Sequence, residues 1–168
     1  FSQVLRTRDG RQVTVKVIAT RTDMPDGPAA LTIVIDETER QRASQALERS
    51  QALLAQVVSM SPDLISLTEL PSGRYVMVND SFERLLGYKT AEVIGRTSLQ
   101  LGLWRDAGQR TALSQAISQD LVVRDHPVEM VTKQGRVIPL MISGTHVVND
   151  GQAYALTNAR DQTEAHRV

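Results

Sequence analysis

The fold of this chain is decided by residues 128–160, which read VEMVTKQGRVIPLMISGTHVVNDGQAYALTNAR. The stretch contains three runs rich in β-branched and apolar residues, as β-strands are, at residues 128–132, 136–148 and 152–160. Turn residues separate the runs, first Gln134-Gly135 and then Asn149-Asp150-Gly151. The stretch therefore predicts a three-stranded antiparallel meander.

Parts of this pattern also occur at the start of the chain. Residues 7–11 read TRDGR, and residues 132–136 read TKQGR. Residues 36–39 read DETE, and residues 161–164 read DQTE. Both pairs are 125 positions apart (132 − 7 and 161 − 36). Equal spacing at the two ends of a 30-residue span indicates a repeated unit.

The first copy shows the same local signals as the second. Residues 12–20 predict a strand, residues 24–28 a turn and residues 30–35 a buried strand. We interpret residues 1–36 as the last strands of a preceding domain of the same kind, in a piece cut from a longer protein. Because this partial domain lacks helices of its own, we expect one of its faces to be bare, and either paired with another chain's copy or mobile.

Between the two copies, residues 38–59 contain no Gly or Pro and are dense in strong helix formers. Small and apolar residues recur there with the 4, 3, 4, 3 spacing of a coiled-coil seam, at Ala43, Leu47, Ser50, Leu54 and Val57. The spacing predicts a linker helix over residues 37–60 that forms a homodimer or joins two domains. A helix lying on its own domain would show a similar stripe.

The helix must end before Ser61-Pro62. Two strands are predicted next, at residues 64–70 and 75–78, followed by three helices near residues 80–87, 90–94 and 106–119. Asp80 or Ser81 is placed to cap the first of these helices, and Gly87 to end it. Strands on both sides of a block of helices predict an α+β domain with its helices on one face of the sheet.

The strand over residues 137–142 is apolar at every position. A strand with two apolar faces needs cover on both sides. The short helices can cover one face, and the helix over residues 38–59 or a partner chain is the natural cover for the other.

Residues 60–164 resemble the PAS family of sensory domains. The resemblance is carried by short motifs in the family's order: Ser61-Pro62-Asp63-Leu64-Ile65, Val78-Asn79-Asp80-Ser81-Phe82, Leu86-Gly87-Tyr88, Ala91-Glu92-Val93-Ile94-Gly95-Arg96, Thr132 with Gly135-Arg136, and Asp161 with Thr163-Glu164. It implies a five-stranded antiparallel sheet, helices that close a cavity against one face, and a helix that carries a signal onward. The expected organisation is a partial PAS domain at 1–36, a linker helix at 37–60, a complete PAS domain at 61–164 and the start of an output helix at 165–168.

Three residues are candidates for binding a ligand in the implied cavity. Trp104 can stack on a planar ligand, although a lone Trp among Leu residues also fills a core. Asn79 and Arg124 are polar residues within reach of the cavity, and Asn79 also suits a turn or cap. We found no nucleophile–base pair, phosphate loop or catalytic carboxylate pair, so we predict no enzyme activity for this fragment.

Cofactor predictions follow from the Cys and His residues. The chain contains no cysteine, which excludes a cysteinyl-flavin adduct, while non-covalent flavin stays open. The resemblance implies that a haem would be held by a histidine on the long helix, and residues 106–119 contain none, so haem is disfavoured. The three histidines, His126, His146 and His166, lack the close spacing of metal ligands. No cofactor is the simplest expectation.

The charge and hydropathy of the chain limit the kinds of partner that it can bind and the location that we expect for it. Lys plus Arg and Asp plus Glu each number 19, so no excess positive charge is present to bind nucleic acid. The apolar stretches, such as residues 31–35 and 137–142, are too short to cross a bilayer. We expect a cytoplasmic location for this fragment, with the parent protein either free or anchored to a membrane.

The repeated Asp-x-Thr-Glu motif supplies the candidate relay residues: Asp36, Thr38, Asp161 and Thr163. Their side chains can cap the helix that follows the last strand, so movement of the sheet would shift where that helix begins. We therefore predict a sensory module of a bacterial protein that controls an effector in the same chain, first a histidine kinase and second a cyclic-di-GMP enzyme. The alternative is a constitutive dimerisation module that binds no ligand.

Overall fold

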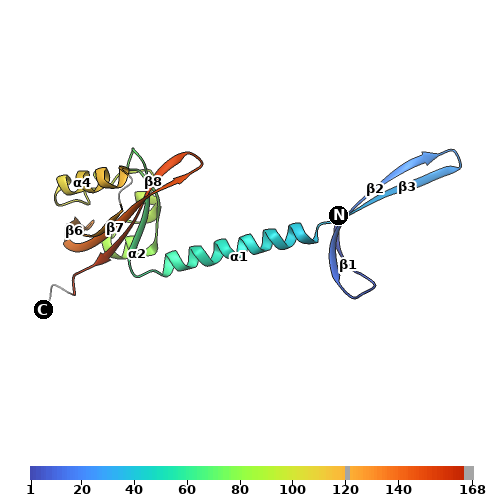
Figure 1. Ribbon diagram of the computed structural model, residues 1–168, viewed down its shortest axis with the longest axis horizontal. Coiled ribbons are helices and arrows are strands. Elements are labelled where there is room, and N and C mark those ends of the chain that lie inside the picture. Colours follow the sequence, from blue (N-terminus) through green and yellow to red (C-terminus); the bar gives the residue numbers. More distant parts are fainter. Residues whose placement is uncertain (120–121, 165–168) are drawn as a thin grey trace. The chain divides into compact units, whose positions relative to one another are not determined.

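The computed structural model describes residues 1–119 and 122–164, and the chain divides into two compact units, Phe1–Leu54 and Ala55–Val168. Each unit is described by itself (Figure 1). None of the helices in the described part of the chain combines the length and the apolar character needed to span a membrane.

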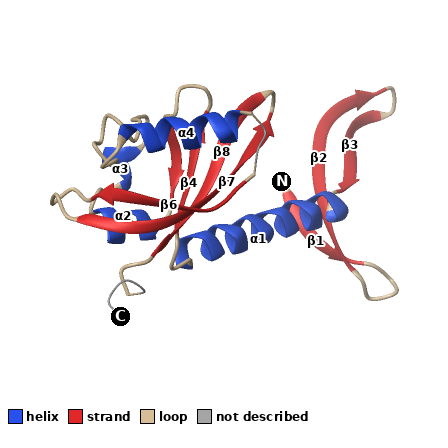
Figure 2. Ribbon diagram, turned by 60° about the vertical axis from the view of Figure 1, so that its left-hand side comes forward, coloured by secondary structure: helices blue, strands red, loops and turns tan. Residues whose placement is uncertain are grey.

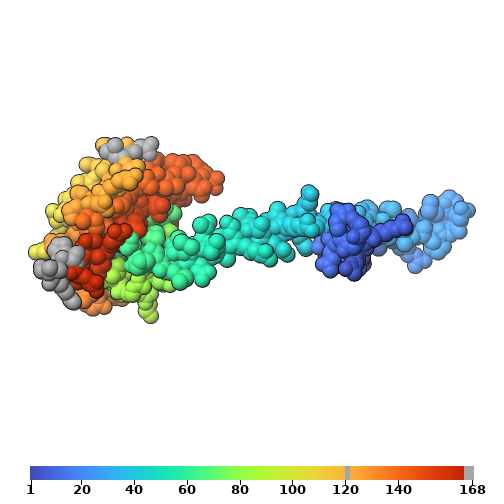
Figure 3. Space-filling view, turned by 60° about the horizontal axis from the view of Figure 1, so that its bottom comes forward, coloured from blue at the N-terminus to red at the C-terminus, as the bar shows by residue number. Residues whose placement is uncertain are grey.

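The second unit is built on a five-stranded sheet in the order β5-β4-β8-β7-β6. Every neighbouring pair is antiparallel, which confirms the sheet that the PAS resemblance implied. The strands are β4 (Leu64–Glu69), β5 (Tyr75–Val78), β6 (Val123–Val131), β7 (Val137–Asn149) and β8 (Gln152–Asp161). The tip of the β7–β8 hairpin projects from the body of this unit (Figure 3).

Three helices pack against this sheet (Figure 2): α2 (Asp80–Leu86), α3 (Thr90–Val93) and α4 (Ala107–Ser118). Gly87 ends α2 in the left-handed conformation, with φ of 80°, as its position predicted. The expected N-cap is corrected: Asn79 occupies that position, Asp80 is already helical, and no side chain caps the helix.

The core lies between the helices and the inner face of the sheet. Its most deeply buried apolar side chains include Phe82, Leu86, Leu103 and Leu140. Strand β7 contributes only one of its two apolar faces. Its even-numbered residues from 138 to 142 are buried, whereas Val137 is exposed and its two odd-numbered apolar neighbours are half-buried. The second face, for which the helix over residues 38–59 or a partner chain was the expected cover, is thus only partly buried within this unit.

The first unit contains a three-stranded sheet in the order β1-β2-β3, with strands β1 (Ser2–Arg6), β2 (Gln12–Met24) and β3 (Gly27–Asp36). Its register repeats that of the β6-β7-β8 meander. Val15 pairs with Asp36, and Leu140 pairs with Asp161, 125 residues further on in both strands. The two copies thus agree in strand pairing as well as in sequence.

The expectation of a buried strand over residues 30–35 is wrong. Most of β3 is exposed, because the first unit has no counterpart of α2, α3 and α4 to cover its sheet. Helix α1 (Thr38–Met60) follows β3, and none of its residues is buried.

Candidate functional site

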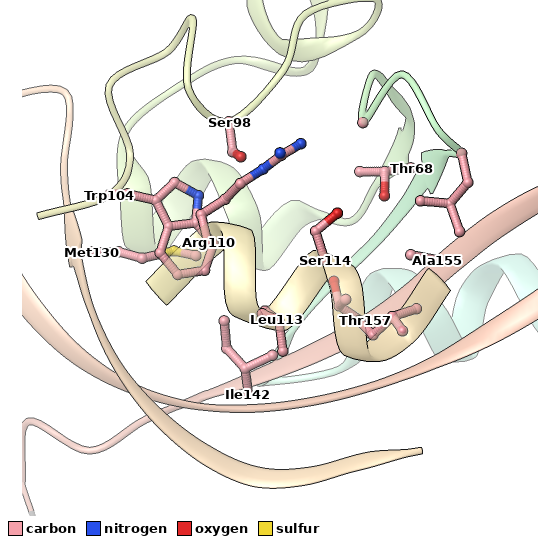
Figure 4. A pocket seen from close by; sticks show the side chains of 13 residues that line it. Thr68, Ser98, Trp104, Arg110, Leu113, Ser114, Met130, Ile142, Ala155 and Thr157 are labelled. Atoms are coloured by element: carbon pink, nitrogen blue, oxygen red, sulfur yellow. The ribbon is translucent and has the colours of Figure 1, made fainter. Parts of the chain in front are cut away.

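A cavity of about 70 Å³ opens between α4 and the inner face of the sheet. A buried water needs at least about 10–15 Å³, so the space holds a few waters or one small organic molecule. Its walls are formed by Thr68, Leu70, Gly73, Ser98, Trp104, Arg110, Leu113, Ser114, Ile117, Met130, Ile142, Ala155 and Thr157 (Figure 4).

Helix α4 supplies one wall through residues spaced by three and four positions, which share a helix face. Arg110 and Ser114 lie on this face together with the buried residues Leu113 and Ile117. Asp106 is the N-cap residue of α4, and its carboxylate accepts a hydrogen bond of 2.8 Å from the Gly108 amide. The cap fixes the first turn, and with it the position from which Arg110 enters the cavity.

Two glycines allow the walls to come this close. A Cβ at Gly144 on β7 would lie 2.7 Å from Cδ1 of Ile117, so any larger residue there would force the Ile117 side chain or the helix to shift. In the β4–β5 turn, the Arg110 guanidinium lies so close to Gly73 that a Cβ there would overlap Nη2. Gly73 also has a φ of +70°, which favours glycine.

Some of the polar groups in and beside the cavity have hydrogen-bond partners within the protein. Thr157 shares a hydrogen bond of 2.7 Å with the Ser66 hydroxyl. Burial raises the pKa of the Tyr75 phenol, and its hydrogen bond with Ser98 and the positive charge of Arg110 oppose that rise only in part. Tyr75 therefore stays protonated and supplies no negative charge to Arg110.

Two donors lack partners in the part of the chain that the structure describes. The buried indole Nε1 of Trp104 has no hydrogen-bond acceptor. Arg110 forms no hydrogen bond or ion pair with any residue of 1–119 or 122–164. In Figure 4 the Trp104 nitrogen lies on the edge of the ring that is turned towards Arg110.

The arrangement is suited to binding and carries no acid–base machinery. Arg110 is the one charged side chain among the described residues that form the walls, and no carboxylate or imidazole accompanies it. Within residues 1–119 and 122–164, no group of three or more His, Cys, Asp or Glu side chains could hold a metal ion. His166 lies outside the described residues.

The cavity does not fit a flavin or a haem. Clefts for ligands of drug size have volumes of about 300–1,000 Å³, well above the 70 Å³ found here. The residues of α4 include no histidine that could ligate haem iron. The walls therefore indicate a ligand of a few non-hydrogen atoms.

Of the three residues predicted to bind a ligand, the structure places only Trp104 in the cavity wall. Asn79 lies outside it, 4% exposed, with its side chain fully engaged by the backbone. Its Oδ1 accepts a hydrogen bond of 2.9 Å from the Ile65 amide, and its Nδ2 donates to the carbonyls of Val58 (3.0 Å) and Asp63 (2.9 Å).

Arg124 also lies outside the cavity, for a reason that the sequence conceals. Strict alternation along β6 would put Arg124 on the same face as Val128 and Met130, which are buried. The register instead shifts by one residue between Val123 and His126, where β6 carries one more residue than β7. Such a bulge turns the residues before it to the other face. Arg124 is accordingly exposed and lines an open depression with Ser143.

The proposed relay residues form matching turns in the two copies. The Asp36 carboxylate accepts hydrogen bonds from the Thr38 amide (2.9 Å) and the Thr38 hydroxyl (2.6 Å). The Asp161 carboxylate accepts the same two bonds from Thr163, with 2.8 Å to its amide. In the first copy a helix follows immediately. The predicted start of an output helix at 165–168 lies outside the described residues.

The seam residues of α1, Ala43, Leu47, Ser50, Leu54 and Val57, are all exposed in the single chain. The three large apolar side chains of this set, Leu47, Leu54 and Val57, are each about 60% exposed.

Sequence reasoning missed the central polar group of the cavity, Arg110. A signal was present: Arg110 lies three residues before Leu113 and seven before Ile117, so it falls on the apolar stripe of its helix. A cation on a stripe that faces the core needs a partner or a ligand. Ser114 follows Arg110 by four residues and shares the same face.

A family model described as PAS domain matches residues 62–164 of the chain. No curated protein matches it. Among solved structures, the PAS domain of an HTR-like protein from Haloarcula marismortui is 24% identical, with a TM-score of 0.62 over 72% of this chain and 98% of that one. A PAS domain from a two-component sensor histidine kinase is 14% identical, with a TM-score of 0.58 over 68% of this chain and 97% of that one.

A third solved structure extends over both units. An RNA-binding light-oxygen-voltage receptor is 14% identical, with a TM-score of 0.60, and the match covers 98% of this chain and 78% of that one. At these identities the likenesses show a shared fold.

Proposed function

Because this chain belongs to the PAS domain family, we propose that it is a sensory module of a bacterial signal-transduction protein. Residues 61–164 would bind a small ligand, and the helices on either side would relay the change to an effector. Residues 1–36 would be the last strands of a preceding PAS domain, and residues 37–60 the helix that links the two. The repeated register of the two meanders supports this division.

The observation that carries the proposal is the position of the cavity on the two strands by which the chain enters and leaves the domain. Thr68 on β4 and Thr157 on β8 both line the cavity. These strands pair directly, with Leu64 opposite Ala159. A ligand that shifts them would therefore act on the end of α1 and on the Asp161–Thr163 turn together.

We also propose the class of effector. One solved relative is named as a PAS domain from a two-component sensor histidine kinase, and we propose a histidine kinase as the effector, with a cyclic-di-GMP enzyme second. The fragment itself would be non-catalytic. The polar side chains of its cavity are the Arg110 guanidinium, the Trp104 indole and hydroxyl groups.

Filling the cavity tests the relay without a known ligand. In Ser114→Leu, a branched apolar chain replaces a hydroxyl that points into the cavity (Figure 4). Ser118→Leu is the matched control, because Ser118 is exposed on the same helix. Hydrogen exchange followed by mass spectrometry should change in peptides covering residues 55–65 and 158–164 for Ser114→Leu only. Unchanged exchange in both peptides, in a folded Ser114→Leu protein, would contradict the relay.

A constitutive dimerisation module is the second candidate. It is favoured by the exposed apolar residues Leu47, Leu54 and Val57 of α1, which suit a partner helix. Under this candidate the chain is a homodimer whether the cavity is filled or empty, and Ser114→Leu leaves the exchange of both peptides unchanged. The same experiment, combined with light scattering to measure mass, separates the two candidates.

A further inference from the structure

We propose that the cavity binds a short-chain carboxylate, whose charged end contacts the guanidinium of Arg110. The proposal rests on the sensory function proposed for the same cavity and gives its ligand a chemical class. Four features carry it: an unpaired cation, donors without acceptors, an apolar end and a small volume.

The charge in the cavity is unbalanced. Arg110 is half-buried. It is the one ionisable side chain among the described residues that line the cavity, and the other described wall residues are neutral. It makes no ion pair with a described residue. The guanidinium therefore has its N–H groups available, and their planar fork matches a carboxylate. An anion in the cavity would complete this arrangement.

The neighbouring polar groups can also donate to an anion. Trp104 Nε1 is buried and lacks an acceptor among the described residues, and an indole nitrogen can only donate. The hydroxyls of Ser114 and Thr68 project into the same space from α4 and β4. No wall carboxylate in the described chain competes for these donors.

The rest of the cavity is apolar and limits the ligand. Leu113 and Ile142 are buried side chains at the end away from the guanidinium (Figure 4), and the buried side chain of Ile117 also lines the cavity. They offer nothing to the outer oxygens of a phosphate but can pack on a short alkyl chain. The volume of about 70 Å³ admits only a few carbon atoms. A monocarboxylate such as propionate satisfies both ends.

The single tryptophan of the chain supplies a direct readout, because Trp104 lies in the cavity wall. The full chain is titrated with sodium propionate while Trp104 emission and the melting temperature are followed. Propionamide has the same number of non-hydrogen atoms without the charge, and sodium chloride and sodium phosphate at equal ionic strength are run in parallel. Saturable changes are expected with propionate only.

Variants then test whether Arg110 is the residue that contacts the carboxylate. Arg110→Gln should weaken propionate binding about tenfold or more, as for loss of a hydrogen bond to a charged group, and Arg110→Lys should retain part of the affinity. Arg105→Gln is the matched control, because Arg105 is exposed and pairs with Glu129 at 3.0 Å. Its affinity should stay within about twofold of the original chain. If Arg110→Gln does not fold, the comparisons of propionate with propionamide and of Arg110→Lys with Arg105→Gln remain decisive.

The outcomes separate this proposal from the proposed function. Equal binding of propionamide, equal effects of chloride, or binding of phosphate in place of propionate would overturn the carboxylate and leave the sensory function standing. Failure of Ser114→Leu to alter exchange would overturn the relay even if propionate binds.

Discussion

The side-chain amide of Asn79 donates a hydrogen bond of 3.0 Å to the backbone carbonyl of Val58, in the last turns of α1. Asn79 is the N-cap residue of α2, but its side chain bonds to other segments of the chain. The same side chain binds the backbone of Asp63 and Ile65 at the start of the sheet. One buried residue thus joins the end of the linker helix, the first strand and α2.

Replacing Asn79 with alanine should therefore destabilise the domain strongly. The change removes three hydrogen bonds and leaves the half-buried Ile65 amide without its acceptor, at a cost of about 2–4 kcal/mol in the free energy of unfolding. Urea denaturation measures this cost. Hydrogen exchange should also become faster in the last turns of α1. Ser59→Ala is the control, since it removes an exposed bond of 2.6 Å to Asp80 and should cost less than about 1 kcal/mol. Equal costs for the two variants would contradict the role given to Asn79.

The order of strands and helices could be predicted because turn and cap signals fall between the elements. Gly87 and Gly135 both adopt positive φ at the turns that the sequence placed there. The face on which each side chain lies was harder to predict, because it depends on register. One extra residue in β6 moved Arg124 to the outer face, at a bulge where Asp125 adopts a φ of 47°.

The close approach of α4 to β7 at Gly144 supplies a second prediction. In Gly144→Ala the new methyl group would lie 2.7 Å from Ile117 Cδ1 and 3.1 Å from Thr157 Cγ2, so the helix or these side chains must move. We expect a loss of about 1–3 kcal/mol in the free energy of unfolding. Ile117→Val removes Cδ1 and alone costs about 0.5–1.5 kcal/mol. The double variant should lose less than the sum of the two single losses, and additive losses in a denaturation cycle would argue against this contact.

The turn between β3 and α1 gives a prediction about pH. The Thr38 hydroxyl, and then the Thr38 amide, hold the pKa of Asp36 below its ordinary value of 3.8. With a lowered pKa in the folded state, the carboxylate stabilises the turn fully above pH 3.8, and this contribution is lost as the pH falls further through the folded pKa. Thr38→Val removes the first donor, so the Asp36 pKa should move up towards 3.8 in a carboxyl-carbon NMR titration.

Asp9 serves as the internal control for that titration. Its pKa is lowered by the Thr7 hydroxyl and by Arg11, neither of which the Thr38→Val change touches. A parallel movement of both carboxyl groups would show a general loss of structure in the first unit and would contradict a local effect of Thr38.

Burial in the first unit marks the limit of prediction from sequence. Residues 30–35 have the composition of a covered strand, yet Leu31, Ile33 and Val34 are each about half exposed or more. The composition of a strand shows whether its side chains are suited to burial. Whether they are buried depends on elements elsewhere in the chain or in a partner that pack against the strand. The same holds for the cavity. The sequence pointed to Trp104, but the unpaired state of Arg110 emerged only from its surroundings.

The apolar seam of α1 leads to the last prediction. If Leu47 and Leu54 pack against a partner helix, Leu47→Glu with Leu54→Glu buries four charges in each dimer and removes four leucine side chains from its core. Since burying one such side chain contributes about 1.5–3 kcal/mol, the dissociation constant should rise at least about a hundredfold in sedimentation velocity. Gln45→Glu with Ala52→Glu adds the same charge to the opposite face of the helix and should leave dimerisation nearly unchanged. If both pairs of substitutions weaken dimerisation to a similar extent, the cause is the added net charge and not the seam. If the unsubstituted chain is monomeric at every concentration, the coiled coil has no part in the relay.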